Sequence, residues 1–502
     1  MDSPILCFVK SGSCYVKMSE KPNILFILCD DLGPWALHCA GTKELHTPNI
    51  DSIAQKGMLF ENFFCVSPVC SPARASLLTG TIPSAHGVHD WLRSGSVDKS
   101  KFERQGKQNP YSGGYRDEDK PIQYLAGKTT YTDVLCQNGY TCALSGKWHL
   151  GDSIHPQHGF SYWYTIGMGG CCYYHPDIVE NGNITVEDGK YVTNLITDKA
   201  LVFLDELSEK KQPFYLSVHY TAPHSPWGAE HHPAEFIDMY QNCTFESIPD
   251  VPDHKWLTCS PVYGTDKRFE NLRGYFAAIS AMDADVGRLL SALDKKGLTD
   301  NTIVIFTADN GMNMGHHGVW GKGNGTFPMN MYDTSVKVPF IISYPPMIRK
   351  GSRTDVPVSA YDFFPTILDM LGFDFKVTER LPGKSFVPAL KGEQSFEGHV
   401  VVFDEYGPVR MIRSKKYKYV ARYPYGENEL YDLEKDPEEN VNLIDDERYA
   451  DIMLDMRCKL EKWFNDYVDP DIDGVKEGVT GLGQLCSAGI YAEKVLKYAQ
   501  TD

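Results

Sequence analysis

Short apolar runs recur along the chain, and each of them ends abruptly in polar or charged residues. Four such runs cover residues 23–29, 141–144, 214–218 and 302–306. A helical spacing of apolar residues, clearest over residues 276–293, lies between runs of this kind. Buried strands that alternate with helices are typical of an α/β protein. The pattern therefore predicts a large mixed, mostly parallel sheet that is flanked by helices.

Each of these predicted strands is followed by side chains that can do chemistry. In chain order they are Asp30 and Asp31, Lys147 and His149, His224, and Asp309 and Asn310. In open α/β sheets, ligands bind where the parallel strands end at their carboxyl edge. We therefore expect these side chains to meet in one functional site.

The pattern changes after a predicted helix over residues 361–371. Residues 400–405, 409–412 and 417–423 are typical of consecutive antiparallel strands, and a helix is predicted over residues 446–464. We divide the chain into an N-terminal extension (1–17), a catalytic domain (18–380) and a smaller C-terminal α+β domain (381–502) that is built on an antiparallel sheet. Residues 93–127 are polar and turn-rich, which predicts a long loop beside the site.

Length and charge narrow the classes of protein. The 502 residues favour more than one domain, and a formal net charge of −17 argues against nucleic acid or an anionic membrane as a partner. No apolar run is long enough to span a bilayer, and the N-terminus lacks the basic and apolar segments of a secretion signal. We therefore expect a cytoplasmic protein whose 14 cysteines are mostly reduced thiols.

The most specific segment reads Cys-Ser-Pro-Ala-Arg over residues 70–74 and continues as Ala-Ser-Leu-Leu-Thr-Gly to residue 80. Pro72 suits the first turn of a helix and Gly80 suits its end, so a helix is predicted here. Cys70 then lies at the positive end of the helix, where backbone N–H groups attract anions. Arg74, one turn further on, can stabilise negative charge beside Cys70.

This segment resembles the signature of the type I (formylglycine-dependent) sulfatases, which belong to the alkaline-phosphatase-like superfamily. The resemblance extends from Pro22 to about Leu443 and includes Leu-Tyr-Asp-Leu at residues 430–433. It implies that Cys70 is oxidised to an aldehyde, formylglycine, which hydrates to a geminal diol. It also implies a maturation partner, either a formylglycine-generating enzyme or an anaerobic sulfatase-maturing enzyme. Ala73 departs from the family pattern, in which serine is common.

Asp30, Asp31, Asp309 and Asn310 form a candidate metal site. Their carboxylate and amide oxygens, with no imidazole among them, suit a hard divalent cation, so we expect Ca²⁺ first and Mg²⁺ second. For the two adjacent aspartates alone, a solvated strand end would be the simpler interpretation. The resemblance implies that these four residues are metal ligands and that a hydroxyl derived from Cys70 is a further ligand.

A set of cationic side chains lies in segments that look like sulfatase motifs. The resemblance implies catalytic roles for Cys70, Arg74, Lys147, His149, His224 and Lys322. In the mechanism that we expect, one hydroxyl of the diol attacks sulfur and forms a covalent sulfo-enzyme. His224, assisted by Lys322, protonates the leaving group, and His149 acts as the base when sulfate is expelled.

Three further residues, Trp91, Arg93 and His317, are candidates for substrate binding. Core packing would explain Trp91 equally well. His316 and His317 are adjacent, and adjacent histidines rarely ligate one ion, so we favour substrate contact for His317. The basic run at residues 413–418 alternates with apolar residues, which predicts a solvated strand face.

The sequence thus predicts a sulfatase that hydrolyses the sulfate monoester of a saccharide, or of a small aryl or steroid compound, to an alcohol and inorganic sulfate. The acidic balance favours a small or oligosaccharide sulfate over a heavily sulfated polymer. One alternative is a phosphonate monoester or phosphodiester hydrolase of the same superfamily. A second alternative is a non-catalytic protein that binds sulfated ligands.

Overall fold

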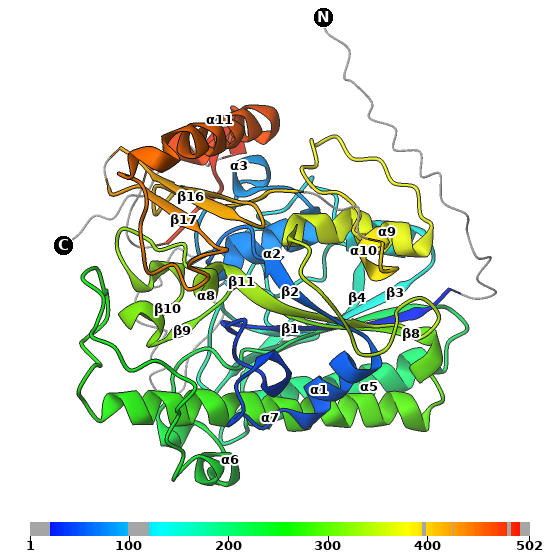
Figure 1. The fold of residues 1–502 in the computed structure, drawn as a ribbon. Helices are drawn as coiled ribbons and strands as arrows, with labels where there is room; N and C mark the ends of the chain where they lie inside the picture. The colour runs from blue at the N-terminus through cyan, green and yellow to red at the C-terminus, as the bar shows by residue number, and fades with distance from the viewer. Residues whose placement is uncertain (1–20, 99–119, 394–397, 425, 479–482, 492–502) are drawn as a thin grey trace, which may run out of the picture.

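A mixed sheet of eleven strands runs through the computed structural model, which describes residues 21–98, 120–393, 398–424, 426–478 and 483–491. Five neighbouring strands at its centre are parallel (Figure 1). In spatial order they are β8 (Thr302–Ala308), β1 (Asn23–Cys29), β7 (Phe214–His219), β3 (Thr141–Gly146) and β4 (Phe160–Ile166). Every residue of β1, β7 and β8 is buried, as expected for parallel strands covered on both faces.

Further strands extend the sheet on both sides, with both antiparallel and parallel pairing. Beside β8 lies β11 (Lys337–Ser343), followed by β2 (Met58–Phe64), which pairs with β12 (Ser352–Thr354) and β13 (Val358–Ser359). Beside β4 lie β5 (Asp177–Glu180) and β6 (Asn183–Val186). A separate two-stranded sheet joins β9 (Asn313–Met314) to β10 (Trp320–Gly321).

Helices cover both faces of the large sheet (Figure 1). On one face lie α1 (Pro48–Lys56), α5 (Val192–Ser208), α6 (Ala234–Met239) and α7 (Lys267–Lys295). On the other lie α2 (Cys70–Thr79), α3 (Pro83–His86), α4 (Tyr131–Gln137), α9 (Phe363–Leu371) and α10 (Val387–Leu390). The short α8 (Asp333–Val336) leads directly into β11. The predicted α/β class is confirmed.

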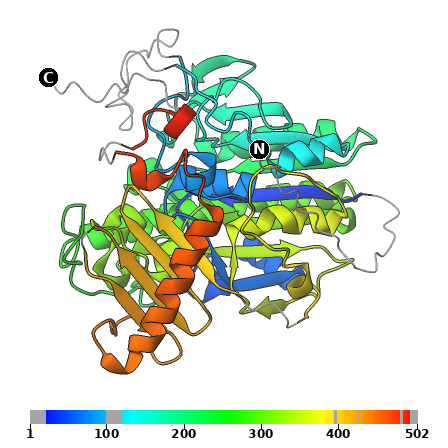
Figure 2. The ribbon, with the colours of Figure 1, turned by 90° about the horizontal axis from the view of Figure 1, so that it is seen from above.

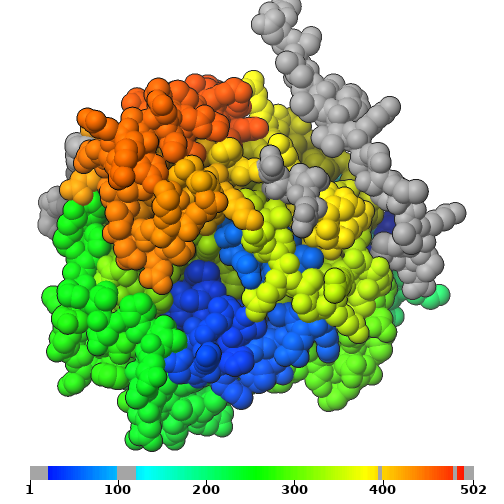
Figure 3. Space-filling view, in the orientation of Figure 1, coloured from blue at the N-terminus to red at the C-terminus, as the bar shows by residue number. Residues whose placement is uncertain are grey.

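The C-terminal region contains the predicted antiparallel sheet. Its strands are β14 (Val400–Asp404), β15 (Val409–Arg413), β16 (Tyr417–Arg422) and β17 (Glu429–Asp432), and α11 (Ala450–Tyr467) lies across one face (Figure 2). Phe464 of α11 packs on Phe403, with ring centroids 4.8 Å apart. The space-filling view shows these C-terminal residues, in orange, packed against the rest of the molecule (Figure 3). The domain boundary at residue 380 stays a prediction, and residues 1–17 lie outside the described residues.

The basic run at residues 413–418 is not the solvated face that its alternation predicts. Lys415 and Lys416 are exposed, but Arg413 and Lys418 are buried. Lys418 forms ion pairs with Asp333 and with a carboxylate from a later loop, and Arg413 also pairs with Asp333. The physical reason is that the two cations form ion pairs with carboxylates from distant segments, and a buried cation needs such a partner.

Two further expectations concern cysteines and the predicted loop. All twelve cysteines in the described part of the chain are free thiols, in agreement with the prediction of reduced cysteines. Residues 99–119, most of the loop predicted beside the site, lie outside the described residues. Among the described helices, none has both the length and the apolar character needed to cross a membrane.

The predicted signature helix is present as α2, and all ten of its residues are buried. Gly80 ends the helix in the left-handed conformation, with φ of 66°. A Cβ atom at this position would lie 2.7 Å from Cβ of Phe364 in α9. Gly80 therefore allows both the turn and the close approach of α2 and α9, which fixes the orientation of the helix that bears Cys70.

We predict that Gly80→Ala destabilises the protein more than Gly297→Ala does. Gly297 has nearly the same φ of 67°, but its Cβ would meet nothing within 4 Å. The left-handed backbone alone should cost about 1–2 kcal/mol, and overpacking against Phe364 should add about 1–3 kcal/mol. Denaturant unfolding of both variants measures the difference. Equal losses would show that the contact with Phe364 does not constrain α2.

Candidate active site

Four strands deliver the predicted site residues to the carboxyl edge of the parallel sheet. Asp30 and Asp31 follow β1, Lys147 and His149 follow β3, His224 lies shortly after β7, and Asp309 and Asn310 follow β8. The N-terminus of α2 brings Cys70 to the same edge, and Lys322 follows β10. The contacts described below bring these side chains together at this edge of the sheet.

The acidic residues are close enough to share one cation. Carboxylate oxygens of Asp30, Asp31 and Asp309 lie within 4.8 Å of one another, and all three residues are buried. Asn310 donates from Nδ2 to Asp31 Oδ1 at 2.8 Å, while its Oδ1 is buried without a hydrogen-bond partner. An amide oxygen that lacks a donor beside three carboxylates fits a hard cation such as Ca²⁺ or Mg²⁺.

Three cations balance these carboxylates in the structure. Lys147 Nζ lies 2.5 Å from Asp30 Oδ2, Lys322 Nζ lies 2.6 Å from Asp31 Oδ1, and Arg74 Nε lies 2.8 Å from Asp309 Oδ2. Burial alone would raise the pKa of Asp30, but Lys147 and the other nearby cations hold it well below its usual range. Burial and the neighbouring Asp30 raise the pKa of Asp309 to about 6 in spite of Arg74.

Cys70 lies between the acids and the cations. Its Sγ is 3.3 Å from Asp30 Oδ1 and 2.7 Å from Lys322 Nζ. Burial and the charge of Asp30 raise the pKa of the thiol, so the unmodified side chain is neutral at physiological pH. Arg74 Nη2 is buried without a hydrogen-bond partner. This free donor suits an oxygen of an anionic substrate bound near Cys70.

The two histidines, His149 and His224, differ in which ring nitrogen is held by a backbone carbonyl. His149 Nε2 donates to the carbonyl of Leu92 at 3.1 Å, so Nδ1 carries a lone pair, and this atom is buried without a partner. Burial and the charge of Lys147 hold the pKa of His149 well below 6.5, so the ring is neutral. His224 Nδ1 donates to the carbonyl of Ser225 at 2.8 Å, and its Nε2 faces Asp31 Oδ2 at 3.6 Å.

The predicted substrate-binding residues lie in two different places. Trp91 and Arg93 flank Leu92, whose N–H donates to Ser71 Oγ at 3.0 Å and whose carbonyl holds His149, so both residues lie beside the site. His317 stacks on Tyr332 with ring centroids 3.8 Å apart. The structure thus places His317 in local ring packing and does not bring it into contact with Cys70. A role in substrate binding stays a prediction for all three.

Sequence reasoning missed several residues around the site. A Cβ at Gly169 would lie 2.0 Å from His149 Nε2, so this glycine makes room for the ring. Tyr173 donates its hydroxyl to the carbonyl of His224 at 2.8 Å, and His219 bonds to the carbonyl of Lys147 at 2.9 Å. Only His219 gave a signal in the sequence, because a histidine at the end of an apolar run is uncommon in a buried strand.

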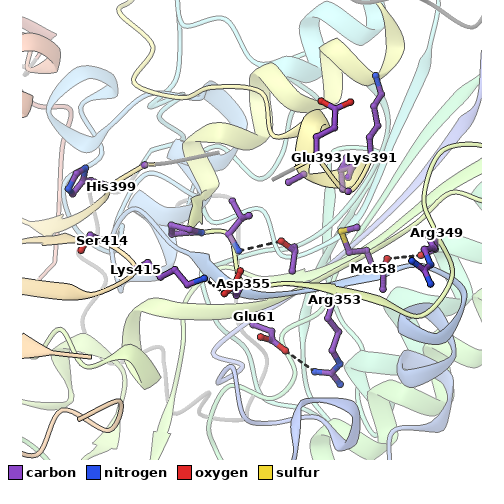
Figure 4. A pocket seen from close by; sticks show the side chains of 18 of the residues that line it. Met58, Glu61, Arg349, Arg353, Asp355, Lys391, Glu393, His399, Ser414 and Lys415 are labelled. Carbon is purple, nitrogen blue, oxygen red and sulfur yellow. Dashed lines mark hydrogen bonds and ion pairs between the residues drawn. The ribbon is translucent and has the colours of Figure 1, made fainter. Parts of the chain in front are cut away.

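A large pocket lies elsewhere, along β12 at the edge of the sheet (Figure 4). It has a volume of about 1280 Å³, and none of the predicted site residues lines it. Two ion pairs lie within its wall, since Arg353 contacts Glu61 at 3.3 Å and Lys415 contacts Asp355. The pocket therefore does not compete with the cluster around Cys70 as the candidate active site.

Comparison with known proteins assigns the chain to a class. Residues 22–373 match the model of the sulfatase family, and residues 315–466 match the family described as N-sulphoglucosamine sulphohydrolase, C-terminal. The chain belongs to the sulfatase family. It is therefore a sulfuric ester hydrolase, and the predicted family, fold class and enzyme class are confirmed.

Relatives in the family act on different sulfate esters. An N-acetylglucosamine-6-O-sulfatase of Bacteroides thetaiotaomicron is 28% identical over 91% of this chain and 88% of its own length. A choline-sulfatase of Rhizobium meliloti is 29% identical over 85% of this chain and 83% of its own. A solved complex with the substrate D-glucosamine-2-N,6-O-disulfate has a TM-score of 0.71 and 27% identity, and the match covers 91% of this chain and 100% of that one.

We predict that Ca²⁺ stabilises the chelator-treated protein by reducing the repulsion among the three buried carboxylates. At about 100 times the dissociation constant, the gain should be about 2.7 kcal/mol, with a corresponding rise in the thermal midpoint. Asp309→Asn should lose most of this shift. The control Asp355→Asn, at a half-exposed carboxylate of the edge pocket, should keep it. If neither Ca²⁺ nor Mg²⁺ moved the midpoint of the unaltered protein, the metal assignment would be wrong.

Proposed function

We propose that this chain hydrolyses the sulfate monoester of a small saccharide, with a formylglycine made from Cys70 as its nucleophile. One observation carries the proposal: Cys70 lies between a carboxylate cluster and Lys322, at the N-terminus of a helix in which Arg74 Nη2 has no hydrogen-bond partner. The named saccharide sulfatase among the relatives supports a sugar ester, and aryl or steroid sulfates are the second choice.

The proposed metal ligands are Asp30, Asp31, Asp309 and Asn310, with Ca²⁺ preferred to Mg²⁺ and a hydroxyl from position 70 as a further ligand. When bound, the cation would act as a Lewis acid toward a sulfate oxygen and toward the nucleophilic hydroxyl. Arg74, Lys147 and Lys322 would bind the remaining sulfate oxygens and stabilise the negative charge that develops in the transition state.

The proposed proton transfers follow from the histidine tautomers. His224 is fixed by the carbonyl of Ser225 so that Nε2 faces the cluster, and with Lys322 it would protonate the leaving oxygen. His149 keeps a bare lone pair on Nδ1, as a base for the release of sulfate requires. Trp91, Arg93 and His317 are proposed to contact the substrate beyond the sulfate group.

Two finer points belong to the same proposal. A formylglycine-generating or anaerobic sulfatase-maturing enzyme would oxidise Cys70, which is buried in the folded protein and would therefore be modified before folding is complete. We also propose a cytoplasmic location, where the cysteines that are free thiols in the described residues would stay reduced.

The runner-up activity is hydrolysis of a phosphonate monoester or a phosphodiester. A phosphonate monoester hydrolase of Agrobacterium radiobacter has a TM-score of 0.66 but only 22% identity over 89% of this chain and 96% of its own, so the likeness shows the fold alone. A non-catalytic role in binding sulfated ligands is disfavoured, because every predicted catalytic residue is present and the cluster is assembled.

We predict turnover of an aryl sulfate at a kcat/KM at least about 100-fold above that for the matching aryl phosphonate or phosphodiester, which corresponds to about 2.7 kcal/mol in the transition state. Cys70→Ala, which cannot form the aldehyde, should abolish sulfate turnover and leave binding of the sulfate ester measurable. Equal or greater activity on the phosphorus esters would favour the runner-up, and full activity of Cys70→Ala would exclude Cys70 as the nucleophile.

We predict that the loss caused by His224→Asn depends on the leaving group. Asparagine can retain the hydrogen bond to the carbonyl of Ser225 but has no group in place of Nε2. Hydrolysis of a sugar sulfate, whose alkoxide needs a proton, should slow about 10²–10⁴-fold. Nitrophenyl sulfate, whose leaving group is stable as an anion, should lose far less. Equal losses on both substrates would show that His224 is not the acid.

A further inference from the structure

Lys147 is bonded to His219 through both of its backbone polar groups. The N–H of Lys147 donates to the carbonyl of His219 at 2.8 Å, and Nδ1 of His219 donates to the carbonyl of Lys147 at 2.9 Å. The same carbonyl accepts Nη1 of Arg74 at 3.0 Å. The backbone of Lys147 thus connects two of the proposed sulfate-binding cations to a histidine that has no other role in the proposed mechanism.

The histidine is the end of a buried chain of hydrogen bonds whose direction is determined. A carbonyl only accepts, so His219 Nδ1 carries the hydrogen. Burial, and to a lesser extent Arg74, lower the pKa of His219 to about 3, so the ring is neutral and Nε2 is an acceptor. Ser217 Oγ, at 2.7 Å, must therefore donate to Nε2.

The same logic fixes the two hydroxyls beyond Ser217. Since Ser217 gives its only hydrogen to His219, it must accept from Tyr215, whose hydroxyl lies 3.1 Å away. Tyr215 must in turn accept from Tyr131 at 2.6 Å. All of these side chains are buried. The chain has a single direction, and it holds His219 in the tautomer that can donate to Lys147.

The backbone around the contact between His219 and Lys147 is closely packed. Gly146, which pairs with His219 across β3 and β7, has φ of 118°, and a Cβ there would lie 1.9 Å from the carbonyl oxygen of His219. The ring of His219 also packs edge-on against Phe26, with centroids 6.3 Å apart. A change at His219 would therefore shift the backbone of Lys147 itself.

We infer that His219 is a positioning residue that fixes the backbone of Lys147, and through it the two cations Lys147 and Arg74, relative to the sulfate group. The inference rests on the proposed function, in which both cations contact sulfate. Positioning of this kind is valuable because a displacement of about 1 Å in a catalytic group can cost about 100-fold in rate. His219 itself does not touch the substrate and is not a catalytic residue.

The matched variants His219→Asn and His219→Gln test this inference. Asparagine places an amide N–H near the position of Nδ1, and glutamine places it near Nε2. We expect His219→Asn to keep kcat for the sulfate ester within about threefold, and His219→Gln to lower it about 10–100-fold with a smaller change in KM. Rates are expressed per folded molecule that contains the aldehyde, as determined by peptide mass.

A second pair covers the case in which glutamine prevents folding. Ser217→Ala keeps the ring but removes the donor to Nε2, and it should lower kcat about fivefold or more. Ser145→Ala removes an equally buried hydroxyl, which donates to the carbonyl of Ile196, and it should leave kcat unchanged. Equal rates for the asparagine and glutamine variants, or equal rates for the two alanine variants, would overturn the inference.

Lys147→Ala separates this inference from the proposed function. If Lys147→Ala left kcat unchanged, the proposed contact between Lys147 and sulfate would be wrong, whatever the His219 variants did. If Lys147→Ala lowered kcat strongly while both His219 variants stayed near the unaltered rate, the proposed function would stand and the positioning role of His219 would fail.

Discussion

Three carboxylates lie buried within 4.8 Å of one another at the carboxyl edge of the sheet, and the need to offset their repulsion governs the rest of the site. In the structure, Arg74, Lys147 and Lys322 each lie within 2.8 Å of a different one of these carboxylates, so the formal charges of the six groups cancel. A divalent cation held by the same oxygens would offset two of the three negative charges, so the basic side chains would be needed less as partners of the carboxylates and could bind an anionic ester. A strong local field of this kind is compatible with a chain whose net charge is −17.

The parallel sheet makes this arrangement possible because its strands end together. Side chains separated by hundreds of residues meet where β1, β3 and β8 end, and α2 brings Cys70 to the same point with its N-terminus. Antiparallel strands on either side widen the sheet without contributing to the cluster. The carbonyl of Lys147 also links side chains at this edge, since it accepts hydrogen bonds from Arg74 and His219 at the same time.

The sequence allowed prediction of those features that depend on local pattern. Asp30 and Asp309 are predictable because each follows a buried strand directly. Pro72 and Gly80 mark the helix that begins at Cys70, but the role of Cys70 as the nucleophile rests on the resemblance to the sulfatase signature. Features that depend on partners from distant segments were not predictable in this way. Alternation alone made Lys418 look solvated, because nothing local reveals that Asp333 covers it. The stacking of His317 on Tyr332 is a tertiary contact of the same kind.

The central claim is that Cys70 becomes the aldehyde nucleophile of a sulfate ester hydrolase, and the mass of the peptide that contains Cys70 tests it most directly. The measurement uses protein purified from the native host, together with its turnover of an aryl sulfate. The account predicts the mass of formylglycine, in proportion to the activity of each preparation. Active protein in which this peptide has only the mass of the unmodified thiol would contradict it.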